Sequence, residues 1–125
     1  MNLGLYAKGL DLMADNGYPP VQFEGFKGKR FDWYWSTAAH NTVCIDGEDQ
    51  SESGGRFLWL RKAQCRVEQM PDSPDSFSFS GFHDGYSRLK SPVRHKRHVS
   101  YDAAQSELTV RDEISGSGRH YVAQL

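Results

Sequence analysis

Two residues of this chain carry side chains that zinc prefers, a carboxylate at Asp15 and an imidazole at His40. Both are expected at strand ends, where a side chain can point into a cleft. A closed zinc site takes about four ligands, so two residues alone do not define one. The same residues also fit a simpler interpretation, in which Asp15 forms a turn before Asn16-Gly17 and His40 is a hydrogen-bonded histidine at a strand end.

A second group is aromatic and falls in the long segment 21–35, which has no clean hydrophobic period. Aromatic faces pack against the C–H faces of sugar rings, and an arginine can bind a uronate carboxylate through paired hydrogen bonds. The residues available for such a platform are Tyr18, Arg30, Trp33, Tyr34 and Trp35. The same aromatic side chains could instead form a small satellite core that closes a surface loop.

A third candidate is the motif His83-Asp84-Gly85-Tyr86. Asp-Gly is a turn signal, so one interpretation is a turn with a partly buried tyrosine. The other places His83 and Tyr86 at a ligand cleft.

A fourth candidate is the basic run Arg88, Lys90, Arg94, Lys96 and Arg97. It could attract an acidic polysaccharide, or it could be the solvated face of a strand on which Arg94, Lys96 and His98 point outward. In that strand His95 and Arg97 share the face of Val93 and Val99, and they need buried partners such as Asp112.

The elements that position these residues are predicted to be short strands joined by turns. Alternating or apolar stretches occur at 2–7, 10–15, 41–45, 57–60, 63–70, 77–79, 93–101, 108–110 and 120–125. Gly9 and Asp46-Gly47 are turn signals, and no segment predicts a long helix. The sequence therefore predicts one all-β domain over 1–125, an antiparallel β-sandwich.

Composition excludes several classes of function. The net charge of −1 and the lack of an RNA-binding motif argue against a nucleic-acid partner. No apolar run is long enough to span a membrane, and no signal peptide opens the chain. The two cysteines, Cys44 and Cys65, could form one bridge or remain two buried thiols.

The stretch from Ser36 to Gln50 is the most specific. It places His40-Asn41-Thr42 before an apolar strand and Asp46-Gly47 after it. Together with Asp15-Asn16-Gly17-Tyr18 and His83-Asp84-Gly85-Tyr86, it resembles the supersandwich-like β-sandwich domain of heparinase II/III-like polysaccharide lyases. The resemblance runs over essentially the whole chain.

The resemblance implies a ligand set. In this family a structural zinc ion is held by a histidine of an opening His-x-His-x-Asp motif, by an aspartate that matches Asp15, and by a later histidine that matches His40. The opening motif would precede Met1, so the zinc ligands are expected to be incomplete and the sandwich to lack its first strand. An unpaired sheet edge would favour association with a second copy. A tyrosine of the family's substrate cleft matches Tyr18.

The resemblance also implies an activity, the β-elimination of uronate-containing polysaccharides. In the family much of the catalytic work falls to an N-terminal helical toroid, so no catalytic residue is assigned in this chain. We expect a fragment that is inactive alone, with the toroid and an acidic polysaccharide as partners, from a periplasmic or secreted protein. A non-catalytic carbohydrate-binding module and a purely structural sandwich are the rival hypotheses.

Overall fold

The computed structural model describes residues 2–15, 32–55, 58–70, 73 and 76–124. Its contacts divide the chain into two compact units, one formed by residues 63–119 and the other by 2–62 with 120–125. Within the described residues no helix is both long and apolar enough to cross a membrane.

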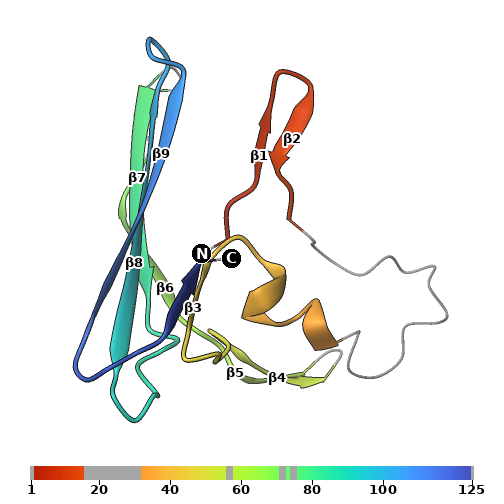
Figure 1. The fold of residues 1–125 in the computed structure, drawn as a ribbon, viewed down its shortest axis with the longest axis vertical. Coiled ribbons are helices and arrows are strands. Elements are labelled where there is room, and N and C mark those ends of the chain that lie inside the picture. The colour runs from red at the N-terminus through yellow and green to blue at the C-terminus, as the bar shows by residue number, and fades with distance from the viewer. Residues whose placement is uncertain (1, 16–31, 56–57, 71–72, 74–75, 125) are drawn as a thin grey trace, which may run out of the picture. The chain divides into compact units, whose positions relative to one another are not determined.

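Residues 63–119 form a four-stranded antiparallel sheet in the order β6–β7–β8–β9 (Figure 1). The strands are β6 (Cys65–Gln69), β7 (Ser76–His83), β8 (Val93–Asp102) and β9 (Glu107–Gly116). Along β8 every second side chain from Val93 to Val99 is buried, because successive side chains of a strand point to opposite faces. The predicted arrangement of this strand is confirmed: His95 and Arg97 are buried, whereas Arg94, Lys96 and His98 are on the other face.

The other unit contains three two-stranded antiparallel sheets. They pair β1 (Leu5–Ala7) with β2 (Leu10–Met13), β3 (Val43–Ile45) with β10 (Val122–Gln124), and β4 (Glu52–Gly55) with β5 (Leu58–Arg61). A short 3-10 turn, η1 (Thr37–Ala39), precedes β3. The three side chains of β3 are buried, which makes this strand the centre of the unit.

Two turns of this unit fall at the predicted turn signals Gly9 and Asp46-Gly47, although Lys8 was not predicted to take a positive φ. Lys8 and Gly9 connect β1 to β2 with φ values of 52° and 80°, and Asp46 and Gly47 follow β3 with φ values of 56° and 72°. Positive φ at both central residues matches the twist of a tight hairpin turn, and glycine and aspartate tolerate it. Each turn thus fixes the position of the strand next to it.

The antiparallel sheets confirm the predicted class, an all-β sandwich. Some predicted boundaries were wrong. β9 extends to Gly116 and β10 begins only at Val122, while β4 was not predicted. Both cysteines are free thiols, as one interpretation held, but Cys65 is exposed rather than buried. Of the aromatic segment, residues 21–31 lie outside the described residues.

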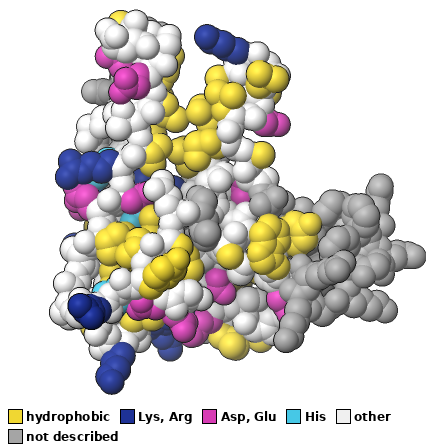
Figure 2. All heavy atoms as spheres, viewed as in Figure 1, with side chains coloured by type: hydrophobic (Ala, Val, Ile, Leu, Met, Phe, Trp, Pro, Cys, Tyr) yellow, Lys and Arg dark blue, Asp and Glu magenta, His cyan; other side chains and the backbone are white. Residues whose placement is uncertain are grey.

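The surface mixes both signs of charge. Figure 2 shows basic side chains beside acidic ones on the part of the molecule that the four-stranded sheet forms. This mixture fits the interpretation of the basic run as a solvated strand face.

Candidate functional site

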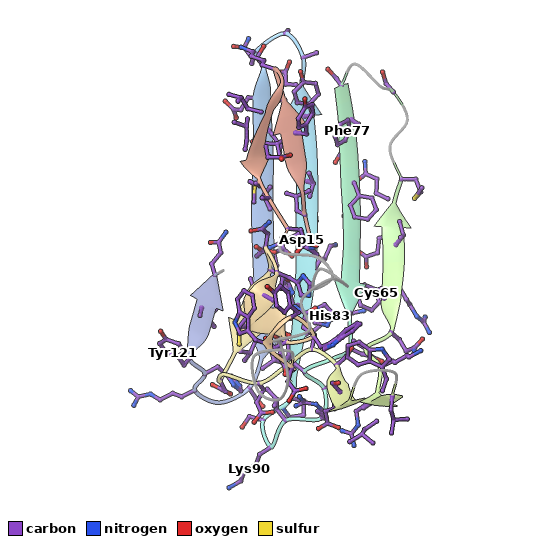
Figure 3. All side chains as sticks on the ribbon, turned by 90° about the vertical axis from the view of Figure 1, so that its right-hand side faces the viewer. Asp15, Cys65, Phe77, His83, Lys90 and Tyr121 are labelled. Carbon is purple, nitrogen blue, oxygen red and sulfur yellow. The ribbon has the colours of Figure 1, made fainter. Side chains whose placement is uncertain are left out.

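Asp15 and His40, the two predicted metal ligands, are in direct contact. Asp15 follows β2 by two residues (Figure 3), and His40 ends the η1 turn, where its N–H donates to the Thr37 carbonyl at 3.2 Å. The Nδ1 atom of His40 lies 2.7 Å from Oδ1 of Asp15. Each side chain retains just under a third of its exposure, 28% for His40 and 30% for Asp15. The pair is therefore preformed and accessible.

Asn41 attaches the turn that carries His40 to both strands of the β1–β2 hairpin. Its side-chain amide donates to the Leu3 carbonyl at 3.0 Å and to the Ala14 carbonyl at 2.9 Å. Its backbone N–H donates to Oδ1 of Asn2 at 3.0 Å. Because Ala14 directly precedes Asp15, these bonds set the distance between Asp15 and His40. The His40-Asn41 pair is visible in the sequence, but the sequence alone predicts no role for Asn41.

The chain around His40 is fixed by the rest of the Ser36–Gln50 stretch. The N–H of Thr37 donates to Oδ1 of Asp49 at 2.6 Å, and the N–H of Gln50 donates to the Thr37 hydroxyl at 2.8 Å. The Gln50 amide also donates to the Thr42 hydroxyl at 2.9 Å and to the Val43 carbonyl at 3.2 Å. Hydrogen bonds thus join the two ends of the Ser36–Gln50 stretch, the part of the sequence with the most specific family resemblance.

A carboxylate and an imidazole fit zinc by type, but a closed site needs more ligands. No cluster of three or more His, Cys, Asp or Glu residues occurs within the described ranges. Two ligands of tetrahedral zinc stand roughly 3.3 Å apart, so this pair would open by about half an ångström to hold a metal together. Asp15 and His40 are therefore two side chains of types that zinc takes, fewer than a closed site needs.

A hollow of about 290 Å³ borders Asp15 along the hairpin. Its lining residues are Gly4, Leu5, Tyr6, Asp11, Met13, Ala14 and Asp15. The carboxylate of Asp15 thus borders a space that a ligand group could enter.

The described part of the aromatic segment combines features of both interpretations. Trp35 packs edge-on against Trp59 with ring centroids 6.1 Å apart, as a satellite core would. Trp33 contacts Tyr34 at 5.3 Å but keeps 42% of its surface exposed, as a sugar platform requires. Trp35 also lines a second hollow of about 440 Å³. Tyr18 and Arg30 lie outside the described residues.

The motif at 83–86 fits the turn interpretation. His83 and Tyr86 are both completely buried, and their rings lie 5.4 Å apart. His83 ends β7 opposite Cys65 of β6, whereas Phe77 lies at the other end of β7 (Figure 3). Complete burial leaves neither side chain a surface for a ligand in this arrangement.

His83 begins a buried chain of hydrogen bonds across three strands. The Gly85 N–H donates to Nδ1 of His83 at 3.1 Å, so this ring carries its proton on Nε2 and donates it to Nδ1 of His95 at 3.0 Å. His95 in turn donates from Nε2 to Oδ1 of Asp112 at 2.7 Å. In each ring Nδ1 accepts a hydrogen bond and Nε2 donates one. Each ring therefore carries a single proton and is neutral.

Arg97 closes the chain by balancing the charge of Asp112. Its Nε donates to Oδ1 at 2.7 Å and its Nη2 to Oδ2 at 2.8 Å, a bidentate pair. Burial alone would raise the pKa of Asp112, but the hydrogen bonds from Arg97 and His95 hold it well below its usual value. Burial lowers the pKa of His83 to about 3. The predicted partnership of His95 and Arg97 with Asp112 is confirmed.

A second carboxylate–imidazole pair holds the last strand. His120 Nδ1 lies 2.7 Å from Oδ2 of Asp46, and the Tyr121 N–H donates to Oδ1 of the same carboxylate at 2.8 Å. The hydrogen bond from His120 lowers the pKa of Asp46. The contact distance equals that of the Asp15–His40 pair, but the family resemblance does not match Asp46 or His120 to a metal ligand.

The fold and the pair define an all-β domain in which a carboxylate after the β1–β2 hairpin contacts an imidazole at the end of the η1 turn. The family model for the heparinase II/III-like C-terminal domain matches residues 1–125, and the chain belongs to this family, a family of polysaccharide lyases. The resemblance seen in the sequence is confirmed. Neither a curated protein nor a solved structure matches the chain.

We predict that acid destabilises the chain through His83. Its pKa is lowered from 6.5 to about 3 on folding, so the stability it contributes is complete above about pH 6.5 and falls as the pH drops toward 3. Each unit in that window costs up to about 1.4 kcal/mol. Asp112, whose pKa is also lowered, adds a loss below its unfolded value of 3.8. The free energy of unfolding in urea should fall as the pH drops from 7.5 to 4.5, and in His83→Gln it should fall less steeply. An equal slope in the variant would contradict this account.

We predict that Asn41→Asp loosens the hairpin. The substitution keeps the shape but replaces two N–H donors with a carboxylate that faces two carbonyls, at a cost of about 1–3 kcal/mol. Hydrogen exchange should rise in 5–7 and 10–13 but not in β8. Asn2→Ala, which removes only the acceptor of the Asn41 backbone N–H, is the control and should have the smaller effect. Equal exchange in wild type and Asn41→Asp would contradict the assignment.

Proposed function

We propose that this chain forms the β-sandwich part of a polysaccharide lyase that cleaves uronate-containing polysaccharides by β-elimination, and that Asp15 and His40 hold a structural zinc ion in it. The observation that carries the proposal is the 2.7 Å contact between these two residues. The resemblance to the family implies that both residues are zinc ligands, and they lie 25 residues apart in the sequence.

The reaction needs groups of three kinds. A base removes the proton from the carbon next to the uronate carboxylate, and that electron pair forms a carbon–carbon double bond as the glycosidic C–O bond breaks. An acid gives the leaving oxygen a proton. A cation or hydrogen-bond donor neutralises the carboxylate, because the proton is otherwise too weakly acidic. We assign most of these roles to a helical toroid elsewhere in the full-length protein.

The role of this chain in that reaction is to build one wall of the cleft. Nδ1 of His40 and Oδ1 of Asp15, which are in contact at 2.7 Å, would be the two ligand atoms, and zinc would take the place of the proton between them. When bound, zinc would link the hairpin to the η1 turn and so stiffen the wall. Asn41 keeps the two donors at their spacing. Trp33, with its exposed ring, is the proposed sugar contact, together with Trp35, Tyr18 and Arg30.

A carbohydrate-binding module without catalysis is the second candidate. The exposed Trp33 and the 440 Å³ hollow beside Trp35 favour it, because sugar binding needs an aromatic face but no acid or base. The two candidates differ in whether they need a metal.

We predict that the chain binds zinc through Asp15 and His40. After dialysis against zinc and then metal-free buffer, the wild type should retain more zinc than Asp15→Asn or His40→Gln. His120→Gln is the matched control, since His120 makes the same 2.7 Å contact with a carboxylate. The control should retain zinc as the wild type does. Equal retention by all four proteins, or no retention by the wild type, would contradict the zinc site.

We predict that the chain alone does not cleave a polyuronate. Ultraviolet absorbance of the unsaturated uronate should stay at background with the chain and rise with the full-length protein. His40→Gln in the full-length protein should lower kcat, while His120→Gln should leave the rate within about twofold. Cleavage by the chain alone would contradict the division of labour between the domains.

A further inference from the structure

The exposed face of the four-stranded sheet carries a cluster of cations around one aromatic ring. The strand register places Arg66 of β6 opposite Phe82 of β7, and Phe82 opposite Lys96 of β8. The guanidinium carbon Cζ of Arg94 lies 3.6 Å from the centroid of the Phe82 ring. Arg66 and Arg94 are exposed, and Phe82 is half-buried. These residues form what we call the Phe82 cluster: Arg66, Phe82, Arg94 and Lys96.

Carboxylates neutralise this face unevenly. Lys96 pairs with Glu68 at 2.5 Å, and Arg111 pairs with Glu113 at 3.3 Å. The hydrogen bond from Lys96 lowers the pKa of Glu68, and the charge of Arg94 adds a smaller effect. Within the part of the chain that the structure describes, no ion pair involves Arg66 or Arg94. Of the three cations of the Phe82 cluster, only Lys96 thus pairs with a carboxylate, that of Glu68; Glu113, opposite Lys96 on β9, pairs with Arg111.

Stacking prepares Arg94 to bind an anion. A guanidinium that lies over an aromatic ring keeps its N–H groups in a plane and directs them outward from the edge of the stack. Arginine then binds a carboxylate or a sulfate through two parallel hydrogen bonds. Because the ring holds the guanidinium in place, less side-chain entropy is lost on binding.

We propose that the Phe82 cluster is a second polysaccharide-binding site, at which Arg66 and Arg94 bind the acidic groups of a uronate chain. It shares no residue with the Asp15–His40 pair. The choice of a polysaccharide over other polyanions rests on the proposed function, whereas the preference for an anion rests on the arginines and the ring. Such a site would hold the polymer while other parts of it are processed.

Affinity for a galacturonic acid oligosaccharide tests the proposal. Isothermal titration at low ionic strength should show about tenfold weaker binding for Arg94→Gln and for Arg66→Gln, as expected for one charge-assisted contact. Arg111→Gln removes the same charge from the same face but from an arginine that already has Glu113, and it should change affinity less than twofold. Phe82→Leu should weaken binding although every charge remains.

Two results would overturn the proposed binding site. The proposal is overturned if Arg111→Gln weakens binding as much as Arg94→Gln, because binding would then follow net charge alone. It is also overturned if a neutral galactan or a single-stranded DNA of equal length binds as tightly as the uronate. Asp15→Asn and His40→Gln should bind normally. Loss of zinc with retained binding would therefore refute the metal site and leave this one intact.

Discussion

The three hydrogen bonds of Asn41 are the constraint on which the Asp15–His40 site depends. Strands β1 and β2 make only a two-stranded sheet, which is marginal by itself in water. By donating to the carbonyls of Leu3 and Ala14, the Asn41 amide fixes both ends of that hairpin to the residue next to His40. The same amide thereby places Asp15 within hydrogen-bond distance of the imidazole. An apolar side chain at position 41 could not do this, because two carbonyls need donors.

The four-stranded sheet also buries polar groups, and there side chains satisfy one another by hydrogen bonds. Its core holds a carboxylate, a guanidinium and two imidazoles. The hydrogen bonds run in one direction from Gly85 through the two rings to Asp112, which also accepts from Arg97. The arrangement is stable because it contains one balanced ion pair and no further charge. The arrangement is sensitive to acid, because a second proton on either ring would remove the hydrogen bond that its Nδ1 atom accepts. The sheet is therefore expected to respond to pH, whereas the proposed zinc site is expected to respond to metal.

Residue types and periodicity predicted much of the fold. The turns at Gly9 and at Asp46-Gly47 and the buried and exposed faces of β8 follow from local signals. The burial of Arg97 called for a partner such as Asp112, which the structure confirms. β4 was missed because Ser53-Gly54-Gly55 is a poor strand former that depends on pairing with β5. The Asp15–His40 contact came from family resemblance. The bonds of Asn41 and the Asp46–His120 pair could not be predicted, because they join residues far apart in sequence and leave no periodic trace.

The most direct test of the central claim is to follow the imidazole signals of His40 and His120 by NMR while zinc is added. Both histidines contact a carboxylate at 2.7 Å, so simple electrostatic attraction would treat them alike. A metal site at Asp15 and His40 predicts that the His40 ring signals shift and saturate at one zinc per chain while those of His120 stay in place. Equal shifts of both rings, or none at His40, would contradict the account.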